Sequence, residues 1–152
     1  MAEGLMRTLL PSHGLFSAGL CALDGAPADP LAVALMREAG IDITSHRSRR
    51  LGAWMLAEAS LVYTMEASQA AWLRRQHPRH AHKIARLGDL CGADIPDPHG
   101  QSRDAFEQSY AEIRRAVQAR LPAWLPAVAR QLAQQSATSL TSPTASTSPA
   151  LS

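Results

Sequence analysis

The chain has 152 residues, of which 46% are hydrophobic and 18% charged, and its formal net charge is +2. This length and composition suit one domain with one hydrophobic core, and they exclude a chain that is disordered throughout. The small net charge and the scarcity of aromatic residues argue against nucleic-acid binding, and no stretch is apolar enough to predict a membrane span. Residues 1–10 have neither a lysine-rich start nor a long apolar run, so we expect no signal peptide and a cytoplasmic location. Two cysteines are too few for a disulfide framework, so we expect reduced thiols.

Helical periodicity alternates with short apolar runs along residues 1–135. The helical patterns cover residues 1–10, 30–39, 51–59, 66–76 and 102–135, and the strand candidates are residues 15–18, 61–65 and 84–87. Short buried strands separated by helices predict an α/β domain with a parallel sheet that is covered on both faces.

Further predictions concern the first helix, the last helix and the C-terminal tail. The first helix begins at Met1 with no capping residue before it, which places an ammonium group at the positive end of the helix dipole. In the last helix, Pro122 and Pro126 are expected to kink or break the C-terminal part. Residues 136–152 contain only uncharged Ser, Thr, Ala, Pro and Leu, so we predict a domain over residues 1–135 followed by a disordered tail.

Asp97 is a candidate catalytic residue because Pro96 and Pro98 flank it. Two prolines fix the backbone on both sides of the carboxylate, and such rigid placement suits a general acid. The same pattern also occurs in ordinary proline-containing turns, and such a turn without a catalytic role is the commoner interpretation of Pro-Asp-Pro.

Two basic stretches are candidate binding sites. Residues 46–50 (HRSRR) can hold an anionic ligand through guanidinium groups, or form a solvated turn. Residues 74–86 hold five cations and three histidines without any acid, yet the histidine spacing matches no zinc site and only Trp72 is near for stacking. We therefore predict no metal and a polar loop there.

Neither cysteine has the surroundings of an activated nucleophile. Cys21 lies among Ala and Leu, and Cys91 precedes Gly92, so neither has in its sequence the neighbouring cation or helix start that activates a thiol. The sequence also contains no glycine-rich phosphate loop and no G-x-S-x-G motif.

Several stretches together resemble the bacterial type of the low-molecular-weight protein-tyrosine phosphatase family. They are MAEGLMR (1–7), FSAG (16–19) with PADP (27–30), GIDI (40–43) with HRSR (46–49), TME (64–66), residues 83–88, and DIPDP (94–98). The stretches occur in the family's order and spacing, and the resemblance extends to about residue 117.

The resemblance implies a doubly wound, four-stranded parallel sheet and hydrolysis of phosphotyrosine through a phosphocysteine, without cofactor or metal. Asp97 matches the general acid and base. Pro98 and His99 match the substrate wall, where His99 replaces the family's usual tyrosine, and Ser17 and His46 match residues that brace the phosphate-binding loop. The implied substrate is a phosphotyrosine protein, such as a bacterial tyrosine kinase of polysaccharide export. Oligomeric state is not implied.

The nucleophile of that family sits in a C-x5-R-[ST] loop, which the 152 residues do not contain. Six positions after Cys21 stands Pro27, and six after Cys91 stands Asp97. We therefore expect that the family's first, internal strand and its loop, about fifteen residues, are missing through a misassigned start, and that the chain folds poorly alone and is inactive. The alternatives are a non-catalytic pseudo-phosphatase that serves as an interaction module and, less favoured because Cys91 has no partner thiol nearby in the sequence, an arsenate reductase.

Overall fold

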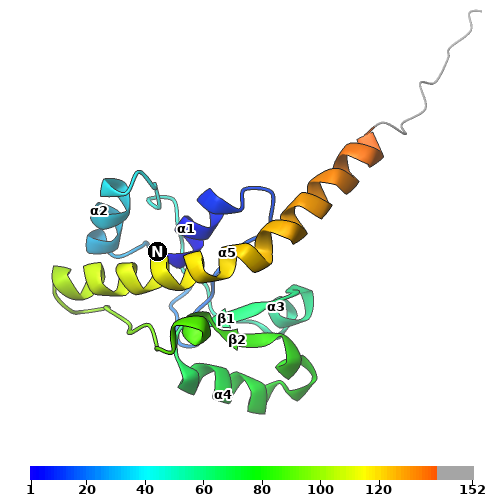
Figure 1. Cartoon of the computed structure of the whole chain (residues 1–152). Coiled ribbons are helices and arrows are strands. Elements are labelled where there is room, and N and C mark those ends of the chain that lie inside the picture. The colour runs from blue at the N-terminus through cyan, green and yellow to red at the C-terminus, as the bar shows by residue number, and fades with distance from the viewer. Residues whose placement is uncertain (140–152) are drawn as a thin grey trace, which may run out of the picture.

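A computed structural model describes residues 1–139 of the chain, with side chains described for residues 1–125. The elements in chain order are α1 (Ala2–Leu9), α2 (Pro30–Glu38), α3 (Ala53–Glu58), β1 (Val62–Thr64), α4 (Ala67–Gln76), the 3-10 helix η1 (Pro78–Lys83), β2 (Ile84–Arg86), the 3-10 helix η2 (Leu87–Cys91) and α5 (Arg103–Ser139). The long helix α5 crosses the molecule and packs against α1, α2 and η2 (Figure 1). All five predicted helices are confirmed.

The two strands form a parallel pair, in which Val62 lies opposite Ile84 and Thr64 opposite Arg86. Helix α4 connects them and packs on both, which is the crossover that parallel strands require. The α/β class with a parallel sheet is therefore confirmed, with two strands formed among residues 1–139.

The prediction of a strand at residues 15–18 is wrong for this structure. The segment is extended, but its backbone is held by side chains of α1 instead of by a neighbouring strand. Arg7 Nη2 donates to the Leu15 carbonyl at 2.8 Å, and the Ser17 N–H donates to Glu3 Oε2 at 2.8 Å. Side-chain partners satisfy these backbone groups, so no ladder forms.

The break that was one of the two predicted effects of Pro122 and Pro126 does not occur, because α5 continues to Ser139. The φ angle of proline lies within the helical range, so each ring removes one N–H donor without excluding helical backbone. The predicted domain boundary at residue 135 falls inside this helix, and most of the predicted tail lies outside the described residues. No helix among residues 1–139 is both long and apolar enough to span a membrane.

Helix α5 contributes to two buried clusters through one apolar stripe. Phe106 and Tyr110 pack with Met36 of α2, and Ile113 and Val117 pack with residues of η2 and of the loop that follows it. A third cluster joins α3, α4 and β2. The stripe fixes α5 against both halves of the molecule, and this positions the loop between η2 and α5.

Candidate active site

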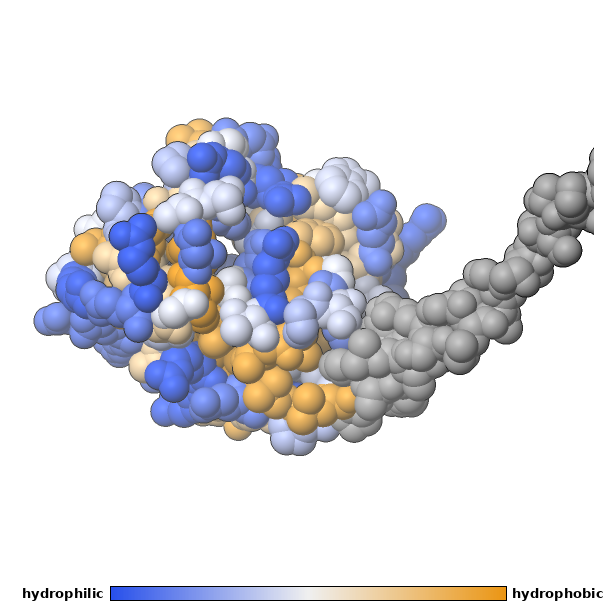
Figure 2. Space-filling view, turned by 90° about the horizontal axis from the view of Figure 1, so that it is seen from above, coloured by the Kyte–Doolittle hydropathy of each residue, from blue (hydrophilic) through white to orange (hydrophobic). Residues whose placement is uncertain are grey.

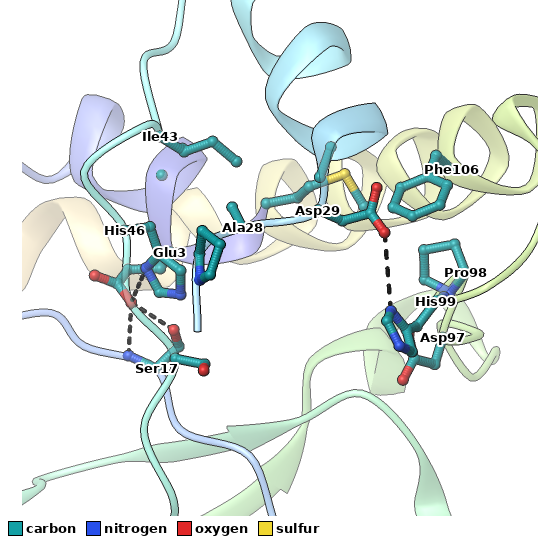
Figure 3. Close-up of a pocket in the computed structure, with 15 residues that line it drawn as sticks. Glu3, Ser17, Ala28, Asp29, Ile43, His46, Asp97, Pro98, His99 and Phe106 are labelled. Atoms are coloured by element: carbon teal, nitrogen blue, oxygen red, sulfur yellow. Dashed lines mark hydrogen bonds and ion pairs between the residues drawn. The ribbon is translucent and has the colours of Figure 1, made fainter. Parts of the chain in front are cut away.

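A cleft of about 270 Å³ lies where α1, the start of α2 and the loop before α5 meet (Figure 3). Its lining includes Glu3, Ser17, Asp29, His46, Asp97 and His99. The face of the molecule seen from above, which carries α1 and α2, is hollowed near its centre (Figure 2). The cleft thus brings together residues from five separate stretches of the chain.

Asp97 lies on a turn that the fold anchors at the two preceding residues. The Ile95 N–H donates to the Met65 carbonyl at 3.0 Å, and the Ile95 side chain is only 2% exposed. Ser109 of α5, also 2% exposed, donates its hydroxyl to the Pro96 carbonyl at 3.0 Å. Asp97 itself is exposed, and its Oδ1 accepts the His99 N–H at 3.0 Å. An anchored but accessible carboxyl is what a general acid needs.

Ser17 and His46 meet at one carboxylate, that of Glu3. Glu3 Oε2 accepts both the backbone N–H and the hydroxyl of Ser17 and lies 3.8 Å from His46 Nδ1. Glu3 Oε1 forms an ion pair of 2.8 Å with Arg7. Figure 3 shows this cluster on the opposite side of the cleft from Asp97 and His99.

Glu3 was not predicted as a site residue, although it stands in the stretch 1–7 that carries the resemblance. A carboxylate in the first turn of a helix is explained by its favourable interaction with the helix dipole. The sequence therefore offered no reason to assign Glu3 a further role as the acceptor for Ser17. The α-amino group of Met1 beside it is buried, and this burial lowers its pKa, while the Glu3 carboxylate acts in the opposite direction.

Asp29 is a second residue that sequence reasoning missed. Its Oδ1 accepts the Leu31 N–H at 2.8 Å and so caps α2, with Pro30 at the first helical position. Its Oδ2 lies 3.8 Å from Nδ1 of His99, whose side chain is 84% exposed. The pair closes one edge of the cleft, next to Pro98.

The arginines of residues 46–50 do not line the cleft, whereas His46 and Ser48 do. Arg47 Nη1 donates to the carbonyls of Thr44 and His46 at 3.0 and 2.7 Å. Arg47 therefore stabilises the turn, and the structure favours the turn over an anion site at this residue.

Asp94 has a structural role, although it stands three residues before Asp97. Its Oδ1 accepts from Arg86 at 2.6 Å and from the Ala67 N–H at 3.0 Å, so it joins β2 to the start of α4. The hydrogen bond from Arg86 holds the pKa of the Asp94 carboxyl below its ordinary value. Asp94 is thus kept ionised as an anchor for the same loop.

Both cysteines are free thiols, Cys21 exposed and Cys91 partly buried, and neither lines the cleft. Among the residues with described side chains, no group of three or more His, Cys, Asp or Glu is placed to hold a metal ion. The prediction of a polar loop for the stretch with His77, His80 and His82 is wrong, because most of this stretch forms η1. Proline at its start fixes φ for the helical turn.

Comparison with known proteins agrees with this architecture. Residues 1–136 match the family model described as low molecular weight phosphotyrosine protein phosphatase. The probable low molecular weight protein-tyrosine-phosphatase EpsP of Ralstonia nicotianae is 38% identical over 128 residues, which are 84% of this chain and 86% of that protein. Wzb of Salmonella typhi is 35% identical over 76% of this chain and 78% of its own.

Solved structures give the same result. The tyrosine phosphatase AmsI of Erwinia amylovora superposes with a TM-score of 0.76 at 32% identity, over 80% of this chain and 82% of that one. Wzb of Vibrio vulnificus in complex with benzylphosphonate gives 0.74 at 33% identity, over 78% and 84%. The chain therefore belongs to the low-molecular-weight phosphotyrosine protein phosphatase family.

Proposed function

We propose that the cleft is the acid–base half of a protein-tyrosine phosphatase site, in which Asp97 protonates the leaving phenolate and then activates water. The observation that carries this proposal is the anchoring of the Asp97 turn at Ile95 and Pro96, which leaves the carboxyl itself accessible at the cleft. Glu3, Ser17 and His46 form the opposite wall, and we assign them to bracing a phosphate-binding loop.

The reaction follows from the family. A cysteine thiolate attacks phosphorus, the bond from phosphorus to the phenolic oxygen breaks, and the proton of Asp97 goes to that oxygen. Water then attacks the phosphocysteine and gives a proton back to Asp97, which releases phosphate and the thiolate. Pro98 and His99 stand where an aryl group would pack, with Asp29 beside them.

The nucleophilic step requires a C-x5-R-[ST] loop, and neither Cys21 nor Cys91 provides one. We therefore propose that the 152-residue chain does not hydrolyse aryl phosphates by itself. The substrate class is a phosphotyrosine protein, for which a bacterial tyrosine kinase is our candidate, and the free thiols fit a cytoplasmic location.

The test compares two proteins on an aryl phosphate. One is the 152-residue chain, and the other carries the strand and C-x5-R-[ST] loop of the Ralstonia relative joined before Met1, with a Cys→Ser change in that loop as its control. We expect turnover only from the extended protein with the intact cysteine. Turnover by the 152-residue chain would contradict the proposal that it is inactive, and a folded but inactive extended protein would favour a non-catalytic interaction module.

A further inference from the structure

A basic surface lies away from the cleft, on α4 and η1. We call it the α4–η1 basic face and define it by Arg75, His77, Arg79, His80, His82 and Lys83. None of these residues lines the cleft. The sequence has no acidic residue between Glu66 and Asp89, so these two elements carry no carboxylate of their own beyond the helix start.

The cations of this face lack acidic partners among the residues with described side chains. Lys83 Nζ donates to the carbonyls of Ala57 and Ala59 at 3.2 and 2.6 Å, which uses two of its three N–H donors and brings no carboxylate to its charge. Arg75 and Arg79 are exposed and form no ion pair within the described part of the chain. Glu58 lies in the sequence between Ala57 and Ala59, whose carbonyls Lys83 binds, yet Glu58 and Lys83 form no ion pair.

Arg86 of the neighbouring strand shows the contrast. It pairs with Asp89 at 2.9 Å and with Asp94 at 2.6 Å, so its charge is compensated inside the fold. The face on α4 and η1 has no such compensation, and its groups are close enough to repel one another. The pKa of His80 lies below its ordinary value because of desolvation and because Lys83, His77, His82 and Arg79 all oppose its protonation.

Trp72 adds an apolar contact to this face. It is 42% exposed and stands three residues before Arg75 on α4, a spacing that makes the two side chains neighbours on a helix surface. An exposed aromatic beside arginines is a common anchor of protein interfaces.

We propose that the α4–η1 basic face docks an acidic segment of a protein partner, with Trp72 contacting an apolar residue of that segment. The ten residues of α4 span about 15 Å, which matches an extended segment of four or five residues at about 3.3 Å each. A small face with one aromatic suits such a segment better than a nucleic acid, whose single strands are bound by several stacking side chains along a longer groove.

Protonation adds a second feature to this site. A bound segment with several carboxylates offsets the repulsion around His80, so binding raises the affinity of His80 for a proton. Affinity for the segment must rise by the same linkage as the pH falls through the range in which His80 takes up its proton. The cationic groups that act on His80 are Lys83 and Arg79, which keep their charge over that range.

The experiment measures binding of a fluorescent peptide of six Glu and Asp residues to the full 152-residue chain by anisotropy. The test variant is Arg75→Gln with Arg79→Gln, and its control is Arg114→Gln with Arg115→Gln on α5, which changes the net charge equally. Circular dichroism confirms that all three proteins are folded alike. We expect the test pair to weaken binding about three- to tenfold and the control pair to leave it unchanged.

Further arms distinguish the partner class. Affinity should fall with added salt and rise from about pH 8 to about pH 5.5, and a variant with His80→Asn and His82→Asn should lose much of the pH effect. Equal weakening by both arginine pairs, or no binding of the peptide, would overturn the proposal. Tighter binding of an oligothymidine or of anionic vesicles than of the peptide, with the same dependence on Arg75 and Arg79, would also overturn it in favour of that partner.

Discussion

Ser17 gives both its backbone N–H and its hydroxyl to the same carboxylate oxygen of Glu3, so one side chain of α1 fixes the segment that forms a wall of the cleft. The Glu3 side chain is only 11% exposed, and Arg7 balances its charge. This contact joins parts of the chain fourteen residues apart, with no strand ladder between them.

Replacing Glu3 should therefore destabilise the fold. Glu3→Ala leaves the Ser17 N–H and the Arg7 guanidinium without their acceptor, and we expect a loss of about 1–3 kcal/mol in the free energy of unfolding. Denaturant unfolding measures it. Glu107→Ala, which removes an exposed ion pair with Arg103, is the control and should cost under about 1 kcal/mol. Equal effects of the two changes would contradict the role of Glu3.

Ser109 holds the Asp97 turn to α5 through the Pro96 carbonyl. Ser109→Ala leaves this acceptor without its buried donor, at an expected cost of about 1–3 kcal/mol in unfolding free energy. In a form of the protein that carries the nucleophile loop, we expect kcat to fall while KM changes little, because the turn positions an acid that acts in the transition state. An unchanged kcat in Ser109→Ala would contradict the claim that this hydrogen bond positions Asp97 for catalysis.

Gly88 is required by a close approach of the backbone. A Cβ atom built on Gly88 would lie 2.0 Å from the Ala93 carbonyl oxygen, so η2 or the loop after it would have to move. We expect Gly88→Ala to cost about 3 kcal/mol or more in unfolding free energy. Gly14→Ala is the matched control because a Cβ there meets nothing within 4 Å. Thermal unfolding measures both variants, and equal unfolding temperatures would contradict the requirement for glycine at position 88.

Arg120 ties α5 to the sheet. Its guanidinium donates to the Leu87 and Arg86 carbonyls at 2.9 and 2.6 Å and lies 4.5 Å from the centre of the Tyr63 ring. Arg120→Lys keeps the charge but cannot reach all three partners with one ammonium group, so we expect it to lose about 1–2 kcal/mol. Full stability of Arg120→Lys in urea unfolding would show that charge alone suffices; Arg115→Lys serves as the exposed control.

The cluster of Arg86, Asp89 and Asp94 predicts how stability responds to acid. Hydrogen bonds from Arg86 hold the pKa of both carboxyls below their ordinary value of 3.8. A carboxyl whose pKa is lower in the folded state stabilises the fold fully above the unfolded pKa, and this stabilisation is lost as the pH falls through the folded pKa. Unfolding midpoints should therefore drop below about pH 4, and Asp89→Asn with Asp94→Asn should flatten that drop. An unchanged pH profile in the double variant would contradict this account.

Local signals in the sequence predicted the helices and the parallel pair because periodicity and burial determine them. The helical pattern over residues 102–135 indicated α5, whose apolar stripe from Phe106 to Val117 is buried in two clusters. The failures are tertiary in origin: residues 15–18 look like a strand, but contacts with Glu3 and Arg7 replace the ladder, and Pro122 stays inside a helix.

The same limit applies to the site. Asp97 was recognisable from its prolines, whereas Glu3 and Asp29 were not, because a helix-start carboxylate and an N-cap are the ordinary roles of such residues. Only the fold places Glu3 between Ser17 and His46, and Asp29 beside His99.

The role of Asp97 as the proton donor is tested most directly by the dependence of its effect on the leaving group. In the extended protein with the C-x5-R-[ST] loop, Asp97→Asn should lower kcat/KM on phosphotyrosine, whose phenol has a pKa of about 10, by about 10²- to 10⁴-fold. The ratio kcat/KM is the right measure because it covers only the steps up to departure of the phenolate, whereas kcat also includes the later attack of water, which needs Asp97 on either substrate. On an aryl phosphate with a much more acidic phenol the loss should be far smaller, since that phenolate leaves without a proton. Asp104→Asn, an exposed change on α5, should leave both rates unaltered. Equal losses on the two substrates, or no loss on phosphotyrosine, would contradict the assignment of Asp97.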